Sequence, residues 1–427
     1  MAARPEELIK PAERISGFGN DVWTMVNSAA AASSIQPIAN LGQGFFGYNP
    51  PRFLIDAAQE ALTKVDCNQY SPTRGRPRLK KALADTYSPL FGRVIDPVTE
   101  ISITTGANEG MLSAIMAFVE PGEEVICFEP FFDQYIRNIH LASAIVKYVP
   151  FMPPSADGRV RIPASEWTLD MQQVRQAISP KTKMMIINTP HNPIGKVFSR
   201  GELLALGELC VQHSIIILSD EVYDRLSYVP FTRISTLSPE IEARTLTVGS
   251  VGKAFYATGW RVGHLIGPAS LINHVSTAHT RICFATPGPQ QEAAAVGYEE
   301  ADSRGFWEES RMDMMSKMAR FNAVWEELGL SYIDPQGGYF VLVNTSRVKI
   351  PASFAFPPEV EERSRDFKLS WFLIMELGVA AIPPADFYSP ENAHLSEDYL
   401  RFAVCKNDDL LELAKQRLRG LKKYMDD

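Results

Sequence analysis

The sequence of 427 residues has no apolar run of about 18 residues, the length that a membrane-spanning helix requires. Its first 17 residues lack the apolar core of a secretion signal, and they include acidic residues, which transit peptides avoid. These absences predict a cytoplasmic protein without a membrane partner, and a mitochondrial pool stays open.

Cysteine and histidine are scarce and unclustered. The five cysteines lie far apart, several of them within apolar runs, which indicates reduced thiols in a core and no disulfide framework. The seven histidines show neither the HExxH pattern nor paired ligand spacing. The sequence therefore predicts no metal site.

Positive charge is in deficit, because 42 lysines and arginines face 50 aspartates and glutamates, giving a formal net charge of −8. The only dense basic stretch covers residues 74–81, where a loop enters a predicted helix. A solvated surface explains such a stretch better than nucleic-acid binding does. Neither nucleic acid nor an anionic membrane is a predicted partner.

What the sequence does contain is a series of short apolar runs that end in polar or glycine residues. Runs that are apolar at every position suit strands buried on both faces of a sheet, and helical patterns such as 108–119 and 201–213 lie between them. This alternation predicts an α/β fold with a largely parallel sheet, and ligands bind beyond the carboxyl ends of such strands. The polar residues that end the runs should therefore converge on one crevice. The runs are Val125–Phe128, Met184–Ile187, Ile215–Leu218, Leu246–Val248 and Val262–Ile266.

Residues beyond about 305 follow a different pattern. A long helix-like stretch over 306–328 precedes a few strand-like pieces and a terminal amphipathic helix, which suits a smaller α+β domain. A chain of this length also exceeds what one core usually organises. We predict an N-terminal arm that joins the small domain (1–50), a large domain (51–305) and a small C-terminal domain (306–427).

One lysine stands in a setting suited to covalent chemistry. Lys253 follows a buried strand and has apolar and glycine neighbours, so its amine can be partly desolvated, as attack on a carbonyl carbon requires. Ser250 and Arg261 flank it with a hydroxyl and a guanidinium, a pair suited to phosphate. A lone lysine is usually a solvated surface charge, but the whole pattern favours a reactive group here.

Other strand ends and one apolar segment carry further candidates. Asp220 could cap a helix, or it could keep a pyridinium nitrogen protonated. Asn192 stands in a proline-rich turn, and residues 106–108 open a helix whose amides suit phosphate. Arg401 lies in an apolar segment, where its charge is costly unless it meets an anion such as a substrate carboxylate; an exposed edge strand is an equal alternative.

Together these strings resemble the fold-type I aminotransferases that depend on pyridoxal 5′-phosphate (PLP). Within them the sequence is most similar to the kynurenine aminotransferase/cysteine-S-conjugate β-lyase group, and to its fungal members. The resemblance runs from Asn40 to Lys406, nearly the whole chain. Its strings are NLGQGF (40–45), NQYSPTRG (68–75), EPFFDQY (129–135), NTPHNPIGKVF (188–198), SDEVYD (219–224), SVGKAF (250–255), GWRVG (259–263) and LRFAVCK (400–406).

The resemblance implies a homodimeric enzyme with PLP as cofactor. It implies transamination of L-kynurenine, and of other aromatic or large neutral amino acids, with a 2-oxo acid acceptor, giving kynurenic acid in tryptophan degradation. β-Elimination from cysteine conjugates shares the intermediates and stays an alternative. A non-catalytic binding or regulatory protein of the same fold is disfavoured, because binding alone needs no lysine such as Lys253.

The resemblance also implies individual roles. Lys253 would hold PLP and act as the base, Asp220 would pair with the pyridine nitrogen, and Tyr223 and Asn192 would bond the ring oxygen. Phe132 would stack on the ring, although core packing explains it equally. The phosphate-binding residues implied are Gly106, Ala107, Asn108, Ser250, Arg261 and, from the neighbouring subunit, Tyr70. The substrate-binding residues implied are Arg401, Gly44 and Asn192 for the carboxylate, and Trp23, Phe284 and Phe340 for an aromatic side chain, each of which could be core instead.

One pattern points elsewhere. Gly42, Gly44 and Gly47 fit the dinucleotide fingerprint GxGxxG. That fingerprint needs a strand before it and a helix directly after it, whereas Tyr-Asn-Pro-Pro follows here. A nicotinamide-dependent enzyme is therefore not favoured.

Overall fold

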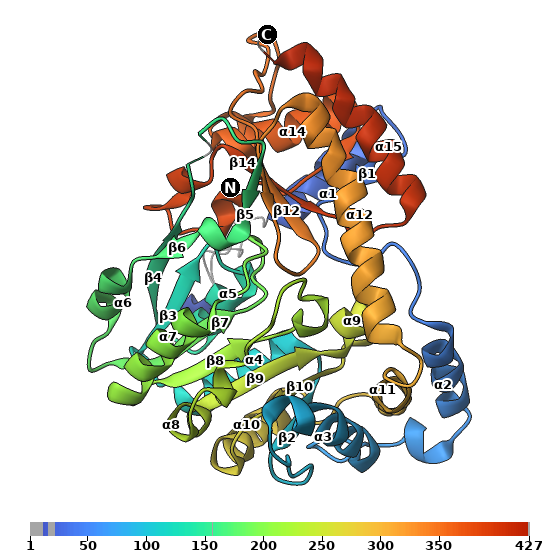
Figure 1. Ribbon diagram of the computed structural model, residues 1–427, viewed down its shortest axis with the longest axis vertical. Coiled ribbons are helices and arrows are strands. Elements are labelled where there is room, and N and C mark those ends of the chain that lie inside the picture. Colours follow the sequence, from blue (N-terminus) through green and yellow to red (C-terminus); the bar gives the residue numbers. More distant parts are fainter. Residues whose placement is uncertain (1–11, 16–21, 156, 426–427) are drawn as a thin grey trace, which may run out of the picture.

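The computed structural model describes residues 12–15, 22–155 and 157–425, and its strands form three sheets (Figure 1). An eight-stranded sheet occupies the lower part of the view, and a four-stranded sheet and a two-stranded sheet lie above it. Among the described residues, no helix is long and apolar enough to cross a membrane. Of the predicted arm, residues 1–11 and 16–21 lie outside the described part.

The large sheet has the order β2-β10-β9-β8-β7-β3-β4-β6. Its middle strands, from β4 through β3, β7 and β8 to β9, are parallel, so the predicted parallel α/β sheet is confirmed. The strands are β2 (Ile101–Thr104), β3 (Glu124–Glu129), β4 (Ile145–Met152), β6 (Thr168–Leu169), β7 (Thr182–Asn188), β8 (Ile216–Asp220), β9 (Thr245–Ser250) and β10 (Gly263–Ile266).

Strand β10 corrects one expectation. It pairs antiparallel with both of its neighbours, β2 and β9. The Gly-Pro that ends this run therefore lies at the opposite edge of the sheet from the ends of β7–β9. The residue that β10 places at the predicted crevice is Arg261, which precedes the strand.

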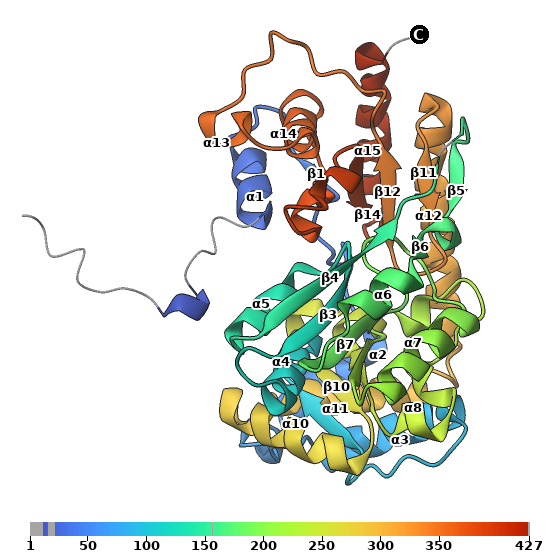
Figure 2. The same cartoon turned by 90° about the vertical axis from the view of Figure 1, so that its left-hand side faces the viewer.

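Helices cover both faces of the large sheet (Figure 2). Successive strand residues pack into different cores: Met184 and Ile186 face α4, α5 and α10, whereas Met185 and Ile187 face α7. This alternation explains why the strands are apolar at every position. The covering helices are α4 (Ala107–Phe118), α5 (Asp133–Leu141) and α10 (Ala269–Ile282) on one face, and α6 (Met171–Ala177), α7 (Arg200–Gln212) and α8 (Pro239–Glu242) on the other.

The upper part combines both ends of the chain. Strand β1 (Ala39–Asn40) pairs in parallel with β13 (Val379–Ala380), and α1 (Val22–Ala32) packs against α14 (Arg365–Leu377). The four-stranded sheet has the order β14-β12-β11-β5. Its strands are β5 (Arg161–Pro163), β11 (Tyr332–Asp334), β12 (Phe340–Asn344) and β14 (Tyr399–Ala403).

Helix α12 (Phe306–Leu328) spans the range predicted for it and runs alongside both parts (Figure 1). It ends at Gly329, whose left-handed φ of 64° suits a residue without a Cβ. The residue numbers of strand β5 fall within the predicted large domain, but the strand pairs with β11 in the four-stranded sheet. The division into domains at residues 50 and 305 stays a prediction.

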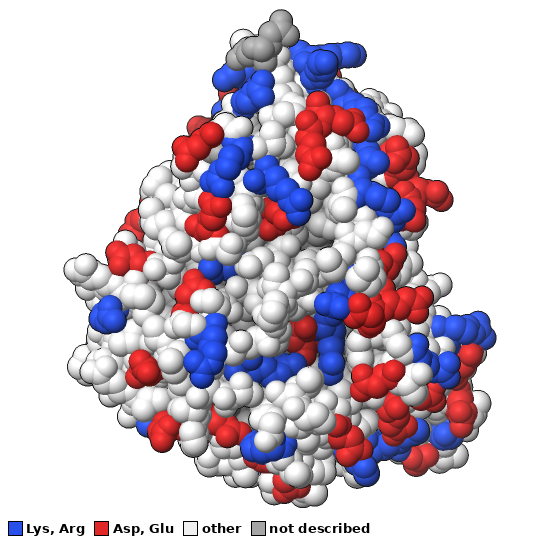
Figure 3. Space-filling model, in the orientation of Figure 1, with Lys and Arg blue, Asp and Glu red and all other residues white. Residues whose placement is uncertain are grey.

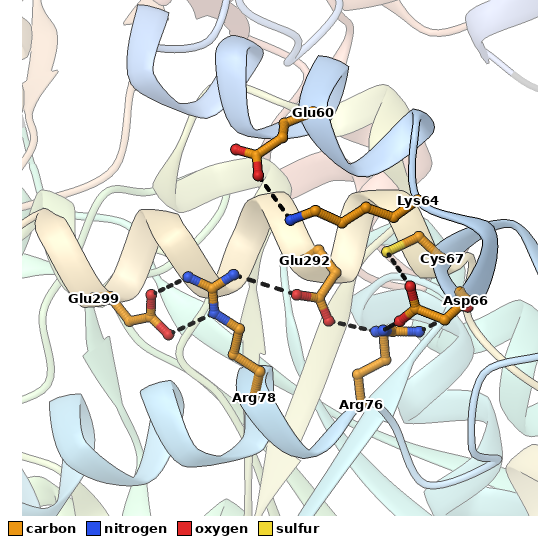
Figure 4. Close-up of polar contacts among 8 residues, drawn as sticks. All are labelled: Glu60, Lys64, Asp66, Cys67, Arg76, Arg78, Glu292 and Glu299. Carbon is orange, nitrogen blue, oxygen red and sulfur yellow. Dashed lines mark hydrogen bonds and ion pairs between the residues drawn. The ribbon is translucent and has the colours of Figure 1, made fainter.

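The basic stretch 74–81 leads into α3 (Pro77–Phe91) and is paired within the chain (Figure 4). Arg76 contacts Glu292 and Asp66, and Arg78 lies 2.6 Å from Glu299, so carboxylates of α11 (Gly288–Glu300) neutralise much of its charge. On the face shown in Figure 3, basic and acidic side chains intermix. These ion pairs account for the stretch without a nucleic-acid partner.

Candidate active site

The carboxyl ends of three parallel strands meet at one cavity of about 240 Å³. Asn192 follows β7, Asp220 ends β8, and Ser250 ends β9, with Lys253 in the short α9 (Val251–Ala254) that follows. The convergence predicted from the strand ends is thus present. Of the residues predicted for the site, the cavity is lined by Trp23, Gly44, Ala107, Asn108, Phe132, Asn192, Asp220, Tyr223, Ser250, Lys253, Arg261, Phe340 and Arg401.

Lys253 lines this cavity and has no carboxylate partner among the described residues. Its Nζ donates to the carbonyl oxygen of Gly44 at 3.1 Å and to the hydroxyl of Tyr339 at 2.6 Å. Burial lowers the pKa of Lys253 to about 8, because desolvation penalises the ammonium form. The amine can therefore lose its proton near neutral pH and act as a nucleophile or base.

Asp220 is a buried carboxylate without a cation bonded to it. Its Oδ2 accepts a hydrogen bond from the Tyr135 hydroxyl at 2.5 Å, and burial raises its pKa. A buried carboxylate gains free energy when a cationic donor approaches. The site therefore has a place for a positively charged nitrogen at the end of β8.

The opposite end of the cavity is built for an anion. The Arg261 Nη1 donates to the Thr258 carbonyl at 3.1 Å, and no carboxylate among the described residues pairs with this guanidinium. It stands beside the start of α4, where Gly106 has a φ of +84°. A Cβ at Gly106 would lie 2.5 Å from Arg261 Nη2, so only glycine permits this approach. Ala107, Asn108 and Ser250 complete the cradle.

Arg401 settles one alternative left open by the sequence. It is not on an exposed edge: only 2% of it is exposed, and the aromatic rings of Trp23, Phe340 and Phe387 lie within 5.3 Å of its guanidinium carbon. Its Nη1 donates to Asn192 Oδ1 at 3.1 Å, while its Nε has no partner among the described residues. Burial lowers the pKa of Arg401 to about 10, so an anion would be strongly favoured here.

Three predicted residues are not among those that line this chain's cavity: Gly106, which directly precedes the lining residue Ala107, and Tyr70 and Phe284. Tyr70 is 89% exposed, and its ring packs edge-on against that of Phe284 with centroids 5.4 Å apart. Phe284 is half exposed and has a left-handed φ of 67°. The structure thus places Tyr70 and Phe284 together on the surface of the single chain.

Sequence reasoning missed several residues of the site. Tyr135 bonds Asp220, and Tyr339 bonds both Lys253 and Gly44. Asn188 donates to the Asp220 carbonyl and accepts from the Asn192 amide, so it ties two strand ends together. Tyr135 lies within the EPFFDQY string, which is the only signal that could have indicated it.

One group of metal-binding residue types lies near the start of α4. The ligand atoms of Glu109, His279 and Cys283 are all within 4.8 Å of one another. The spacing of the histidines in the sequence did not predict that these three residues would lie together. Hydrogen bonds explain it: the Glu109 carboxylate accepts from the Thr105 amide at 2.8 Å and lies 2.9 Å from His279 Nδ1, so the group fixes the loop before α4.

Fold and cavity together define an aminotransferase, and comparisons with known proteins agree. The family described as "Aminotransferase class I and II" matches residues 36–418, so the chain belongs to this family. Members of this family depend on PLP and act on amino acids and 2-oxo acids.

Two relatives and one solved structure show how similar the chain is to other proteins. It is 50% identical to the Saccharomyces cerevisiae protein named "Probable kynurenine--oxoglutarate transaminase BNA3", over 96% of this chain and 94% of that protein. It is 34% identical to the kynurenine--oxoglutarate transaminase of Dictyostelium discoideum, over 97% of each. The crystal structure of yeast Bna3p superposes with a TM-score of 0.95 at 49% identity, covering 98% of this chain and 99% of that one.

Proposed function

We propose that the protein transfers the amino group of L-kynurenine to a 2-oxo acid, with PLP bound at Lys253. The observation that carries the proposal is one cavity holding a desolvated lysine, a carboxylate without a cation and two guanidinium groups without anions. Aromatic side chains of Trp23, Phe132 and Phe340 line the same cavity, which suits an aromatic substrate. The names of the relatives above support the same choice.

The residues present fit PLP at each of its charged or polar groups. Arg261, Ser250 and the amides at the start of α4 would hold the phosphate, and Asp220 would hold the ring nitrogen in its protonated form. Tyr223 and Asn192 would meet the ring oxygen. When bound, the cofactor supplies an aldehyde that takes up the amino group and a cationic ring that withdraws electrons from the substrate's Cα.

The chain's own residues would bind and orient the substrate and move its proton. Arg401, with Asn192 beside it, would fix the carboxylate, which places the substrate's Cα near the cavity centre. Lys253 Nζ is then the base that removes the Cα proton, because its lowered pKa leaves the amine partly unprotonated near neutral pH. The rings of Trp23 and Phe340 flank the Arg401 guanidinium, with centroids 5.3 and 4.3 Å from its central carbon.

A homodimer completes the proposal. Tyr70 and Phe284 form an exposed aromatic pair that is unusual for a solvated surface. We place this pair at the interface of two copies, with Tyr70 reaching the phosphate in the neighbouring copy's cavity.

Steady-state kinetics with kynurenine and 2-oxoglutarate test the function. We expect kynurenic acid to form with the parallel-line pattern of a two-step exchange, and no product under any acceptor would overturn the proposal. In Arg401→Met, the KM for kynurenine should rise about 100-fold, because a buried charge pair is lost. Arg401→Lys keeps the positive charge without the planar guanidinium, so its KM for kynurenine should lie between those of the wild type and Arg401→Met. The matched control substrate is the amine that lacks kynurenine's carboxylate. The wild type should use it only slowly, and Arg401→Met should turn it over at a similar rate.

A further inference from the structure

All four backbone carbonyls of the segment 42–45 accept hydrogen bonds from side chains. The oxygen of Gly42 accepts from Arg401 Nη2 at 2.9 Å. The oxygens of Gln43 and Phe45 accept from Lys406 Nζ at 2.9 and 2.7 Å. The oxygen of Gly44 accepts from Lys253 Nζ at 3.1 Å and from the hydroxyl of Tyr339 at 2.8 Å.

Lys406 is an unusual residue to find at this place. It is 1% exposed, and no carboxylate among the described residues lies within ion-pair distance of it. Its Nζ stands 3.8 Å from the centroid of the Phe45 ring. Burying an ammonium is costly unless its donors are satisfied, and here two backbone carbonyls and one ring satisfy them.

The two lysines bind alternate carbonyls of the segment. Lys406 Nζ donates to the carbonyls of Gln43 and Phe45, and the carbonyl between them, that of Gly44, accepts from Lys253 Nζ. By fixing the peptides on both sides of Gly44, Lys406 restricts the orientation of the carbonyl that meets Lys253. The segment lies directly against the cavity wall, because Gly44 has no side chain and a Cβ there would lie 2.8 Å from the Phe340 ring.

Close packing also explains the glycine pattern that resembled a dinucleotide fingerprint, as Gly47 shows. A Cβ on Gly47 would lie 2.9 Å from the backbone nitrogen of Asn407 and 3.0 Å from the Cα of Lys406. The Gly47 amide donates to the Cys405 carbonyl at 2.9 Å. These glycines let the segment lie directly against the strand end that carries Lys406.

We propose that Lys406 is a positioning residue, which fixes the segment 42–45 so that Gly44 orients Lys253 and bounds the place of the substrate carboxylate. The proposal rests on the proposed function, since it assigns Lys406 a part in the same reaction. Lys406 does not line the cavity, and it acts through the backbone of this segment.

Lys406→Met tests the proposal, because methionine fills a similar volume without a donor. It leaves the Gln43 carbonyl without its Lys406 partner and the Phe45 carbonyl with only the Cys405 thiol at 3.3 Å, and so frees the segment to turn. We expect the KM for the amino-acid donor to rise about tenfold, equivalent to about 1.4 kcal/mol of binding free energy, with a smaller fall in kcat. The pH midpoint of the visible absorption band of the PLP-loaded protein should shift by about 0.5 unit or more, because Lys253 is held differently.

Lys406→Gln and Lys80→Met are the comparison variants. Glutamine keeps a donor, so its KM should lie between those of the wild type and Lys406→Met; it also carries the test if the methionine variant does not fold. Lys80 is likewise buried and donates to a backbone carbonyl, that of Val98 at 3.0 Å, but it lies outside the cavity lining. Lys80→Met should change neither the KM nor the midpoint.

The outcomes separate this inference from the proposed function. A wild-type protein that shows no visible band with PLP overturns the proposed function. A normal wild-type band, with wild-type KM and midpoint in both Lys406 variants, overturns the role of Lys406 alone. Equal changes in Lys80→Met would also overturn it, because they would reflect the loss of any buried lysine.

Discussion

At the scale of the residue, the cavity gathers charges that lack partners of opposite sign within the chain. Lys253, Asp220 and Arg401 line it together. Burial lowers the pKa of Lys253 and Arg401 and raises that of Asp220, so in each case it favours the neutral form. Such shifts mark a site that gains free energy when a ligand of complementary charge enters. The cavity lining holds both a carboxylate and guanidinium groups, which fits a ligand with a cationic ring and an anionic phosphate.

The pKa of Lys253 predicts how cofactor uptake depends on pH. Only the unprotonated amine attacks an aldehyde, and its pKa in the folded, cofactor-free protein is about 8. The rate of PLP uptake should therefore rise about tenfold per pH unit below 8 and level off above it. Stopped-flow absorbance between pH 6 and 10 measures this rate. A midpoint near 10.5, the ordinary lysine value, would contradict the account.

The same pKa has a consequence for stability, which follows from proton linkage. Between pH 8 and 10.5 an unfolded lysine still carries a proton, whereas folded Lys253 does not. The unfolded state thus binds more protons, and the contribution of this residue to the free energy of unfolding rises with pH across that window. In Lys253→Met this part of the rise should disappear from the cofactor-free protein's pH-stability profile.

At the scale of the element, strand ends and helix starts decide which residues meet. Asp220, Asn192 and Ser250 were predictable because each follows an apolar run, and the carboxyl ends of parallel strands share one edge. The direction of β10 was not predictable, since an apolar run has no sign of parallel or antiparallel pairing. Tyr339 was missed because one tyrosine in an apolar segment looks the same whether it packs in a core or faces a lysine 86 positions away.

The loop before α4 gives a prediction at this scale. Gly106→Ala would place a Cβ 2.5 Å from Arg261 Nη2, displacing the guanidinium from the anion cradle. Gly122→Ala is the matched control, because Gly122 has a similar φ of +81° and nothing within 4 Å of a built Cβ. Both variants place an alanine at positive φ, at a cost of about 1–3 kcal/mol; the ψ of 162° at Gly106 lies in a region essentially restricted to glycine. Only Gly106→Ala should also weaken PLP binding, by about tenfold in a fluorescence titration; equal affinities would contradict the assigned cradle.

At the scale of the whole molecule, both ends of the chain close the cavity that the central sheet opens. Trp23 comes from α1, Gly44 from the segment after β1, and Arg401 from β14. The family and the α/β architecture were predictable from ordered strings spread over the chain. Strand β5 was not assigned to the small sheet, because three residues carry too weak a pattern to show which sheet they join.

Subunit mixing tests the proposed homodimer. If Tyr70 acts across the interface, a dimer of one Tyr70→Ala subunit and one Lys253→Ala subunit contains one intact site. Lys253→Ala should be inactive, and Tyr70→Ala should be weak at limiting PLP. When equal amounts of the two variants exchange subunits at random, half of the dimers are mixed and each mixed dimer has one working site of two. The mixture should therefore regain about a quarter of wild-type activity. Activity that stays at the sum of the separate variants would show that Tyr70 does not act in the neighbouring copy.

The absorbance spectrum of the purified, PLP-loaded protein, before and after addition of kynurenine without an oxo acid, tests the central claim most directly. The account predicts a visible band from the lysine-bound cofactor, which kynurenine converts to a near-ultraviolet band with one equivalent of product per site. Lys253→Ala should show no such conversion. A wild-type protein with no visible band after incubation with PLP, or with a band that kynurenine leaves unchanged, would contradict it.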